Sequence, residues 1–569
     1  MFHQIKKFFR KSKRRGSHSI DPDEIFLDSK NLPDFDTHQF EGRMEKPIPK
    51  TVFRMATLFI LFVGLIFVYQ LWGLQVSEGV KFRNRSDNNS LHKIQIYADR
   101  GVIYDRNGVP LVWNTINPDS TDFSLRVYAT STGLSTVLGY VKYPTKDSSG
   151  IYYQDKFVPK DGIEQIYDNQ ISGKDGTKII ETDVKGKIIS ESIVDPSKNG
   201  GDLTLSVDYK LQKKLTSSLL DVADRAGYKG GSGIIMDIHS GEILASSNFP
   251  EYDSQTMTDG SDAKKINNWL TDKNHPFLNR TILGLYTPGS IMKIFVAMGV
   301  LDQGVISPTK QILSTGSISI PNQFFPDKPS IFLDWKAHGL VDLRRAIAVS
   351  SNVYFYEVTG GYKSQKGIGI VNLEKYTRMF GFGTTTGVYF PGEKAGTIPS
   401  PEWKAQNFKG EEWRIGDTYN TAIGQYGFQV TPIQVVRGVA AIANEGTLPV
   451  PTFIKPTKDT VVSESEKISL DPKFYKIVKE GMRLGVTDGT SRAINFPFVE
   501  VASKTGTAQL GFYKDVVNSW VVGFWPLENP KYAYAVVMER GSKNNQFGAV
   551  LVMQEFLDWV HVYASEYLK

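Results

Sequence analysis

Cysteine is absent from the 569 residues of this chain, and histidine is rare. Without cysteine the chain forms no disulfides, has no thiolate nucleophile and builds no cysteine-based zinc site. The eight histidines are scattered, no two of them have metal-ligand spacing, and no HExxH motif is present. The sequence therefore predicts a protein without a metal site.

The glycine-rich signatures of the large nucleotide-dependent classes are also missing. GxxxxGK[ST] and GxGxxG do not occur, which argues against a P-loop NTPase and against a dinucleotide-dependent enzyme. GxSxG is missing too, which argues against an α/β-hydrolase. We therefore expect no cofactor.

Charge is missing from one long stretch near the N-terminus. MATLFILFVGLIFVYQLWGL, Met55 to Leu74, contains no charged residue, and about 20 apolar residues span the hydrocarbon core of a bilayer as a helix. A buried core helix is the alternative, but such helices are rarely apolar on all faces. Tyr69 and Trp72 near one end are typical of an interfacial belt. Because no small-residue cleavage site follows, we predict a retained signal anchor over residues 55–74.

Basic residues cluster before this segment, as in KKFFRKSKRR from Lys6 to Arg15. The positive-inside rule then predicts a cytoplasmic tail over residues 1–54 and places the rest of the chain outside the cytoplasmic membrane. A nucleic-acid contact is the alternative for the basic run. Contact with anionic membrane lipid is the interpretation that we prefer, because the run lies close to the predicted span.

The chain after the anchor begins with a segment of short apolar runs that is rich in Gly, Asp, Lys and Ser. IYADRGVIYDRNGVPLVWN, Ile96 to Asn114, predicts two short strands around an Asn107-Gly108 turn. The following residues, to about Gly201, indicate irregular β structure with little core of its own. Residues 75–202 are therefore predicted to form a β-rich pedestal domain.

Residues 203–569 are predicted to form a larger α+β domain. A strand over Leu203–Val207 and a helix from about Tyr209 come first, and GSGIIMDIHSGEILASS then predicts a hairpin. FVEVASKTGTAQ, VVNSWVVGFW and YAYAVVMER are three late strands. Helices fill the middle, including one that Thr431-Pro432 opens, and Ala549 to Tyr567 has helical period. Two early and three late strands predict one five-stranded antiparallel sheet flanked by helices.

An isolated lysine in an apolar stretch is the first candidate for chemistry. In YTPGSIMKIF, Tyr286 to Phe295, Pro288-Gly289 is a helix-entry signal that places Ser290 at a helix N-terminus and Lys293 on the same face. Desolvation would lower the pKa of the amine, and a neutral amine can take the proton of a serine nucleophile. Backbone N–H groups at the helix start could stabilise an oxyanion. The alternative is a serine N-cap with a lysine that snorkels to solvent.

A second candidate is Ser350-Ser351-Asn352 in AVSSNVYF, which follows an apolar helical segment. Ser350 could relay a proton between Lys293 and a leaving group, and Asn352 could hold a peptide amide. The alternative is a turn that only caps a helix.

The third candidate is Lys504-Thr505-Gly506-Thr507 in ASKTGTA, on a predicted strand of the sheet. Lys504 could offer a cation to a carboxylate, and Gly506 could let a substrate backbone approach closely. Each of the three motifs is weak alone, but their order and their placement on helix, loop and strand make the set specific.

With this set, Ser-x-x-Lys, Ser-x-Asn and Lys-Thr-Gly, the chain resembles the penicillin-binding protein and serine β-lactamase superfamily. RGVIYDRNGVPL, NRTILGLYTPGSIMK and GEILASSNFPEYD resemble the class B penicillin-binding proteins. DWKAHGLVDLRRAIAVSSNVYFYEV and EEWRIGDTYNTAIGQYGFQVTPIQV are similar to their elongation-type branch, the penicillin-binding protein 2 group. This chain departs from the family in one respect. The family usually carries a large insert, the head, between the Arg100 motif and the segment near Gly162-Ile163-Glu164, whereas the connection here is short. The resemblance therefore does not extend to regulation through a head.

The resemblance implies a peptidoglycan D,D-transpeptidase that cross-links stem peptides and is acylated by β-lactams. It implies that Ser290 is the nucleophile, Lys293 the general base, Ser350 the proton relay and Asn352 the residue that positions the amide. It also implies that Lys504 and Thr505 bind the terminal carboxylate beside Gly506, and that the backbone N–H groups of Ser290 and Thr507 form the oxyanion hole.

The implied partners are peptidoglycan stem peptides, membrane lipid, a glycan polymerase of the SEDS family and other proteins of the elongation complex. A division-type transpeptidase of the same class is the nearest alternative. A secreted β-lactamase is disfavoured by the predicted anchor and pedestal. A β-lactam receptor without turnover is disfavoured because residues 1–54 are too short and polar for an effector domain.

Overall fold

The structure, a computed structural model, describes residues 49–83, 91–120, 122–129, 133–148, 152–182, 187–322, 325–457, 464–511, 513 and 515–569. Most of the predicted cytoplasmic tail, including the basic run Lys6–Arg15, lies outside these residues. The chain divides between Leu91 and His92 into two compact units, which are described in turn.

The N-terminal unit contains one long apolar helix. Helix α1 covers Lys50–Trp72 and continues as the π-helical turn η3, Gly73–Ser77. None of its residues is buried, and most of them are apolar. Within the described ranges it is the one helix long and apolar enough to cross a bilayer. It contains nearly all of the predicted span Met55–Leu74 and fits a single-pass membrane anchor.

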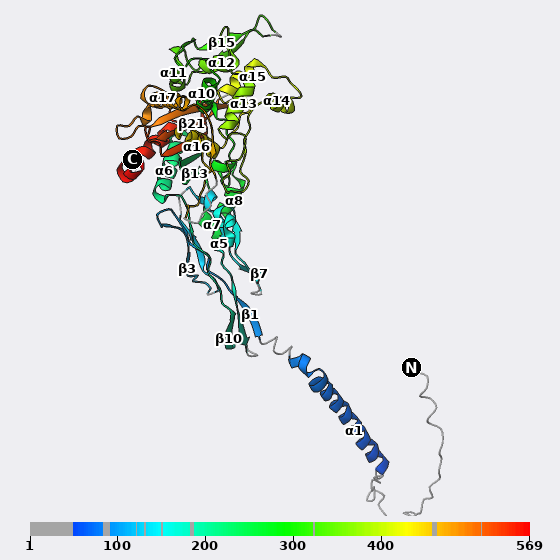
Figure 1. The fold of residues 1–569 in the computed structure, drawn as a ribbon. Coiled ribbons are helices and arrows are strands. Elements are labelled where there is room, and N and C mark those ends of the chain that lie inside the picture. The colour runs from blue at the N-terminus through cyan, green and yellow to red at the C-terminus, as the bar shows by residue number, and fades with distance from the viewer. Residues whose placement is uncertain are drawn as a thin grey trace, which may run out of the picture. The chain divides into compact units, whose positions relative to one another are not determined.

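A five-stranded antiparallel sheet is the centre of the second unit (Figure 1). Its strands run in the spatial order β13-β12-β22-β21-β20. They are β12 (Gly230–Asp237), β13 (Ile243–Phe249), β20 (Ala502–Leu510), β21 (Val516–Trp525) and β22 (Tyr532–Ser542). The predicted α+β fold, with two early and three late strands in one sheet, is confirmed.

Helices cover both faces of this sheet because successive side chains along its strands point alternately into two apolar cores. On β22, Ala533, Ala535 and Val537 join the core that contains α16 (Pro432–Ala443), whereas the intervening side chains join the core under α6 (Tyr209–Ala226) and α18 (Ala549–Tyr563). This is the period-two pattern of a strand buried on both faces. Every residue of α16 is buried, and Thr431 caps this helix as predicted. The structure adds a capping box in which the Gln434 side chain accepts the backbone N–H of Thr431.

The core that contains α16 also includes residues of the helices that bring the three motifs together. They are α10 (Lys293–Asp302), α11 (Leu343–Val349), α12 (Asn352–Gly360), α13 (Gly369–Met379), α15 (Ile415–Ala422) and α17 (Pro472–Asp488). Four short strands form two hairpin-like pairs beside them: β14 (Ile312–Ser314) with β17 (Gly339–Val341), and β15 (Ser317–Ile320) with β16 (Ser330–Leu333). The other helices of this region are α7 (Ser254–Asp259), α8 (Ala263–Thr271), α9 (Arg280–Leu283) and α14 (Pro401–Asn407).

Short strands build the preceding region. Strands β1 (Leu91–Ile96), β9 (Gly176–Thr182) and β10 (Ile188–Asp195) form one sheet, and β2 (Ile103–Tyr104), β3 (Pro110–Thr115), β4 (Leu125–Tyr128) and β11 (Leu203–Thr204) form another. The predicted Asn107-Gly108 turn joins β2 to β3, and Gly108 has the positive φ of 83° that favours glycine. The short helices here are α3 (Ser135–Leu138), α4 (Gly162–Ile166) and α5 (Asp168–Ile171).

A buried ion-pair cluster joins the two ends of the short connection noted in the sequence. Arg100 contacts Glu164 at 2.7 Å, and Arg126 contacts the same carboxylate at 2.8 Å. Burial opposes ionisation of Glu164, yet the adjacent Arg126 and Arg100 hold its pKa below the usual value. Loss of one partner would leave an uncompensated buried charge, so the cluster ties the Arg100 motif firmly to α4.

Two predicted elements are shorter than expected. The strand predicted over Leu203–Val207 ends at Thr204, because Ser206 donates its backbone N–H to Phe453 O and the chain leaves the ladder there. The helix predicted to reach Tyr567 ends at Tyr563, and a separate 3₁₀ turn covers Ser565–Leu568.

Candidate active site

Ser290 lies on a tight turn that precedes α10. The turn is a 3₁₀ helix, η4, over Gly289–Met292, and the α-helix begins only at Lys293. The predicted α-helical N-terminus at Ser290 is therefore a 3₁₀ turn, which is common at such positions. Gly289 has a φ of 59°, and a Cβ on it would lie 3.1 Å from Thr507 O, so glycine brings this turn close to β20.

Lys293 is completely buried, so the alternative of a snorkelling lysine is wrong. Its Nζ donates to Asn352 Oδ1 at 2.6 Å, to Ser350 O at 2.8 Å and to Ser350 Oγ at 3.4 Å. Among the described residues no hydrogen bond joins this amine to Ser290 Oγ. The Lys293 amine thus contacts the second motif directly, whereas Ser290 lies three residues earlier, on the 3₁₀ turn before α10.

The environment of Lys293 favours its neutral form. Burial lowers its pKa to about 7, and the charge of Asp334 works in the opposite direction. A lysine near neutrality at physiological pH can act as a base, which an ordinary surface lysine cannot.

The second motif forms the turn between α11 and α12. Ser350 adopts a left-handed conformation with φ of 58°, which is uncommon for a residue other than glycine and stores strain. Ser351 caps α12 by accepting the N–H of Tyr354 at 3.3 Å. The capping alternative therefore describes Ser351, while the side chains of Ser350 and Asn352 contact Lys293.

Lys504 on β20 approaches the same turn from the sheet. Its side chain is buried, and Nζ donates to Ser350 Oγ at 2.9 Å and to Thr505 O at 2.7 Å. Burial holds the pKa of Lys504 well below its usual value, and the nearby Lys293 lowers it further. The Ser350 hydroxyl thus lies between two buried amines that come from a helix and a strand.

The remaining residues of the third motif follow the pleat of β20. Thr505 shares a hydrogen bond with Thr490, and Thr507 is exposed on this edge strand. Gly506 is buried, and a Cβ on it would lie 2.9 Å from both Pro288 O and a side-chain carbon of Ile291. Within the protein, the missing Cβ of Gly506 therefore lets the Ser290 turn approach β20 closely.

Asp334 contacts the second motif, although none of the three motifs contains it. It follows β16 and accepts hydrogen bonds from Ser351 Oγ at 2.8 Å and from Val353 N at 3.0 Å. It lies in the DWKAHG stretch, which is one of the segments similar to the penicillin-binding protein 2 group. Nothing in this local sequence indicates a contact with the second motif.

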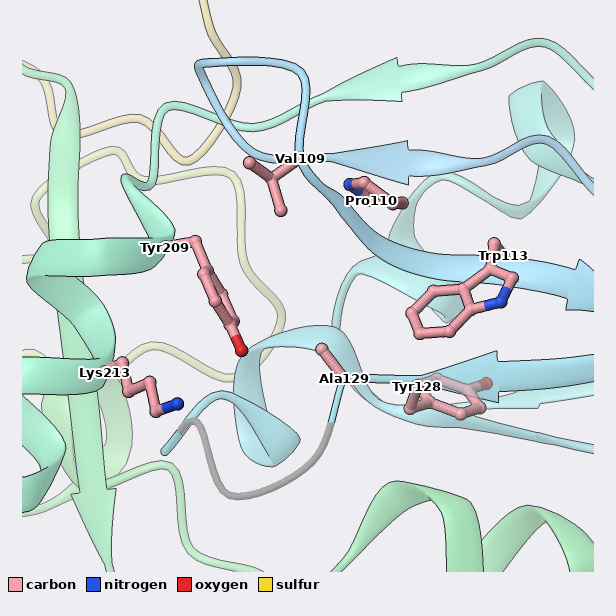
Figure 2. A pocket seen from close by; sticks show the side chains of 7 residues that line it. All are labelled: Val109, Pro110, Trp113, Tyr128, Ala129, Tyr209 and Lys213. Carbon is pink, nitrogen blue, oxygen red and sulfur yellow. The ribbon is translucent and has the colours of Figure 1, made fainter.

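Figure 2 shows a cavity with a volume of about 540 Å³. None of the residues of the three motifs lines this cavity. This cavity lies between β3, β4 and the start of α6, with Trp113, Tyr209 and Lys213 in its wall. Within the described part of the chain, no group of three or more His, Asp or Glu side chains has the arrangement of a metal site.

Fold and cluster together define the active-site-serine class, in which a five-stranded antiparallel sheet brings Ser-x-x-Lys, Ser-x-Asn and Lys-Thr-Gly together. Two family models match accordingly: the penicillin binding protein transpeptidase domain over residues 231–554 and the penicillin-binding protein dimerisation domain over residues 119–205. The chain belongs to the penicillin-binding protein transpeptidase family.

Individual relatives match over most of the chain. It is 27% identical to peptidoglycan D,D-transpeptidase MrdA of Haemophilus influenzae, an alignment that covers 92% of this chain and 95% of that one. The Helicobacter pylori PBP2 solved in complex with MreC is similar with a TM-score of 0.68 at 26% identity, over 84% of this chain and all of the other. A chain from a peptidoglycan synthase complex that coordinates polymerization and crosslinking gives 0.69 at 25% identity, over 89% and 97%.

Proposed function

We propose that this chain is an elongation-type peptidoglycan D,D-transpeptidase that works through a serine acyl-enzyme. The observation that carries the proposal is the placement of Ser350 Oγ between the amines of Lys293 and Lys504. Lys504 lies on β20, the strand against which the Ser290 turn packs. Transpeptidases named MrdA among the relatives favour the elongation branch over the division-type alternative.

In the proposed reaction, Ser290 Oγ attacks the penultimate carbonyl of a stem peptide that ends in D-Ala-D-Ala. The neutral amine of Lys293 takes the hydroxyl proton, and the tetrahedral oxyanion is held by the backbone N–H groups of Ser290 and Thr507. The C–N bond then breaks, and Ser350 passes a proton to the departing D-Ala amine. An amine of a neighbouring stem peptide attacks the ester, which restores Ser290 and forms the cross-link.

Three residues of the site serve binding rather than proton transfer. Asn352 positions the donor amide, and its Nδ2 donates to Leu333 O at 3.2 Å, which fixes the orientation of the side chain. Lys504 and Thr505 bind the terminal carboxylate of the donor. An incoming carboxylate would favour the charged form of Lys504, whose pKa burial keeps low in the free enzyme.

Replacement of Lys504 tests this binding role. In Lys504→Ala we expect acylation by a fluorescent penicillin to slow by at least about a hundredfold, because carboxylate binding and the hydrogen bond to Ser350 are both lost. The melting temperature should change little, since burial disfavours the charged lysine in the free fold. Stopped labelling reactions and thermal melts measure the two effects.

The exposed Lys531, replaced in Lys531→Ala, is the matched control and should acylate like the wild type. A parallel loss of stability and activity in Lys504→Ala would make it a structural lysine and contradict the assignment.

The proposed topology has residues 1–54 in the cytoplasm, an anchor within residues 55–74, a pedestal over 75–202 and the transpeptidase domain over 203–569 outside the membrane. The apolar α1 and the basic residues before it support this orientation. Protease added to intact spheroplasts would test it, since only the domains after the anchor should be cleaved.

The proposed partner is a glycan polymerase of the SEDS family, together with other elongation-complex proteins. The similarity to a chain of a peptidoglycan synthase complex and to the PBP2 solved with MreC supports such assembly. The described helices of the pedestal, α3, α4 and α5, have at most five residues, whereas a helical polymerase domain would need long amphipathic segments. The docking surfaces we propose are the anchor and the pedestal.

A reconstitution experiment tests the partner. The purified full-length chain, given lipid-linked disaccharide-peptide precursor alone, should make no glycan polymer. With the polymerase present, it should yield cross-linked product that penicillin blocks and that Ser290→Ala does not form. Polymer made by this chain alone, above a buffer control, would contradict the division of labour.

A further inference from the structure

A carboxylate, that of Asp334 in the segment after β16, contacts the second motif. Asp334 Oδ2 accepts hydrogen bonds from Ser351 Oγ at 2.8 Å, from Val353 N at 3.0 Å and from Ser314 Oγ at 3.2 Å. Its other oxygen accepts the N–H of Trp335 at 2.9 Å. Through these contacts one side chain joins β14, the segment after β16 and the N-terminus of α12.

The turn that Asp334 holds is strained. Ser350 keeps its left-handed backbone only because the surrounding structure fixes it, and this conformation aims Ser350 O at Lys293 Nζ, 2.8 Å away. Asp334 binds Ser351 and Val353, the two residues that precede and follow Asn352 in the chain. A carboxylate at a helix N-terminus also gains from the partial positive charge of the free N–H groups. Asp334 therefore stabilises both residues that receive Lys293.

Asp334 supplies a negative charge near the two buried amines of the site. Lys293 of α10 faces it, Lys504 of β20 lies beyond Ser350, and His338 Nε2 lies 3.6 Å from Oδ1 with Lys336 nearby. Burial opposes ionisation of Asp334, but the N–H groups of α12, the Ser351 hydroxyl and Lys293 hold its pKa below the usual value. The group is thus a carboxylate wherever the enzyme works.

We propose that Asp334 is a positioning residue for the transpeptidase reaction: its carboxylate fixes the Ser350–Asn352 turn and holds the charge balance of the Lys293 amine that the turn receives. The inference rests on the proposed function of Lys293 as the base. It assigns Asp334 no contact with substrate. Its action passes through Ser351, through α12 and through space to Lys293.

Replacement by asparagine separates the charge from the shape. Asp334→Asn keeps one acceptor oxygen but loses the negative charge that raises the pKa of Lys293. Lys293 then loses its proton at lower pH. The acid limb of the pH–rate profile, the range in which acylation slows as pH falls, should therefore move to lower pH by about one unit. The rate on the plateau should fall by at least about tenfold, because the amide nitrogen cannot accept one of the bonds and the turn loosens.

The measurement is the second-order rate of labelling of the full-length chain by a fluorescent penicillin, at pH values on both sides of 7. Asp342→Asn is the matched control, because Asp342 caps neighbouring α11 by accepting the N–H of Arg345. It should keep the wild-type acid limb. An acid limb of Asp334→Asn that stays at the wild-type pH, or moves to higher pH, overturns the proposal whatever the rate.

A second variant covers the case in which Asp334→Asn does not fold. Ser351→Ala removes one hydrogen bond to Asp334 and keeps the charge, so acylation should slow while the acid limb stays in place. Wild-type rates in Ser351→Ala would then overturn the positioning role. Absence of labelling in the wild-type chain would contradict the proposed function instead, so the two failures are distinguishable.

Discussion

Ser290→Ala should abolish covalent labelling by a fluorescent penicillin and should leave the fold intact. The nucleophilic oxygen is removed, and no other described serine occupies the 3₁₀ turn that places a hydroxyl beside both Gly289 and β20. Ser290 is only partly buried, and its hydroxyl caps no helix, so the melting temperature should stay close to the wild-type value. Gel fluorescence and thermal melts measure the two effects.

Ser307→Ala is the control for this experiment, because Ser307 is an exposed serine in the loop after α10. It should label like the wild type. Labelling of Ser290→Ala that persists, at Ser350 or at another position, would show that the nucleophile was assigned to the wrong residue.

Lys293→Arg should lose acylation by about a thousandfold although it keeps a cation. A general base contributes about a hundredfold to ten-thousandfold, and guanidinium, with a pKa above about 12, cannot act as one. In the wild type, burial lowers the pKa of Lys293 to about 7, so the neutral fraction rises as pH rises through that value. Acylation of the wild type should therefore fall as pH drops below 7.

Rate measurements across this range, with Lys479→Arg as a control, separate base catalysis from charge. Lys479 is a half-buried lysine of α17 that pairs with Glu445, so the control makes the same substitution at a lysine outside the site. Acylation of Lys293→Arg at a rate near that of the control would mean that charge alone matters at this position.

The sequence predicted the strands of the sheet because they carry strong β-forming patterns, and it predicted the motifs because their spacing is specific. The spatial order of the strands depends on pairings between distant segments, such as Gly230–Asp237 with Tyr532–Glu539, which no local pattern encodes. One acceptor of the Lys293 amine, the carbonyl of Ser350, was not predictable for a related reason. It depends on a left-handed backbone at a residue that rarely adopts one.

The contacts of two further residues could not be predicted from their local sequence. Gly506 was correctly placed on a strand, but only the packed structure shows that the Ser290 turn fills the space that its missing Cβ leaves. Asp334 has an ordinary sequence context, and its contacts arise from the pairing of β14 with β17, which brings the segment after β16 against α12. Both effects depend on tertiary packing, which the sequence pattern does not contain.

The central claim is that catalysis proceeds through an acyl-enzyme on Ser290, and trapping that intermediate tests it most directly. The full-length chain would be mixed with a stem-peptide donor that ends in D-Ala-D-Ala, quenched in acid and mapped by mass spectrometry. We predict that the donor, shortened by one D-Ala, is attached to the peptide that contains Ser290 and is absent from Ser290→Ala. Release of D-Ala without an adduct on that peptide, or an adduct on another residue, would contradict the claim.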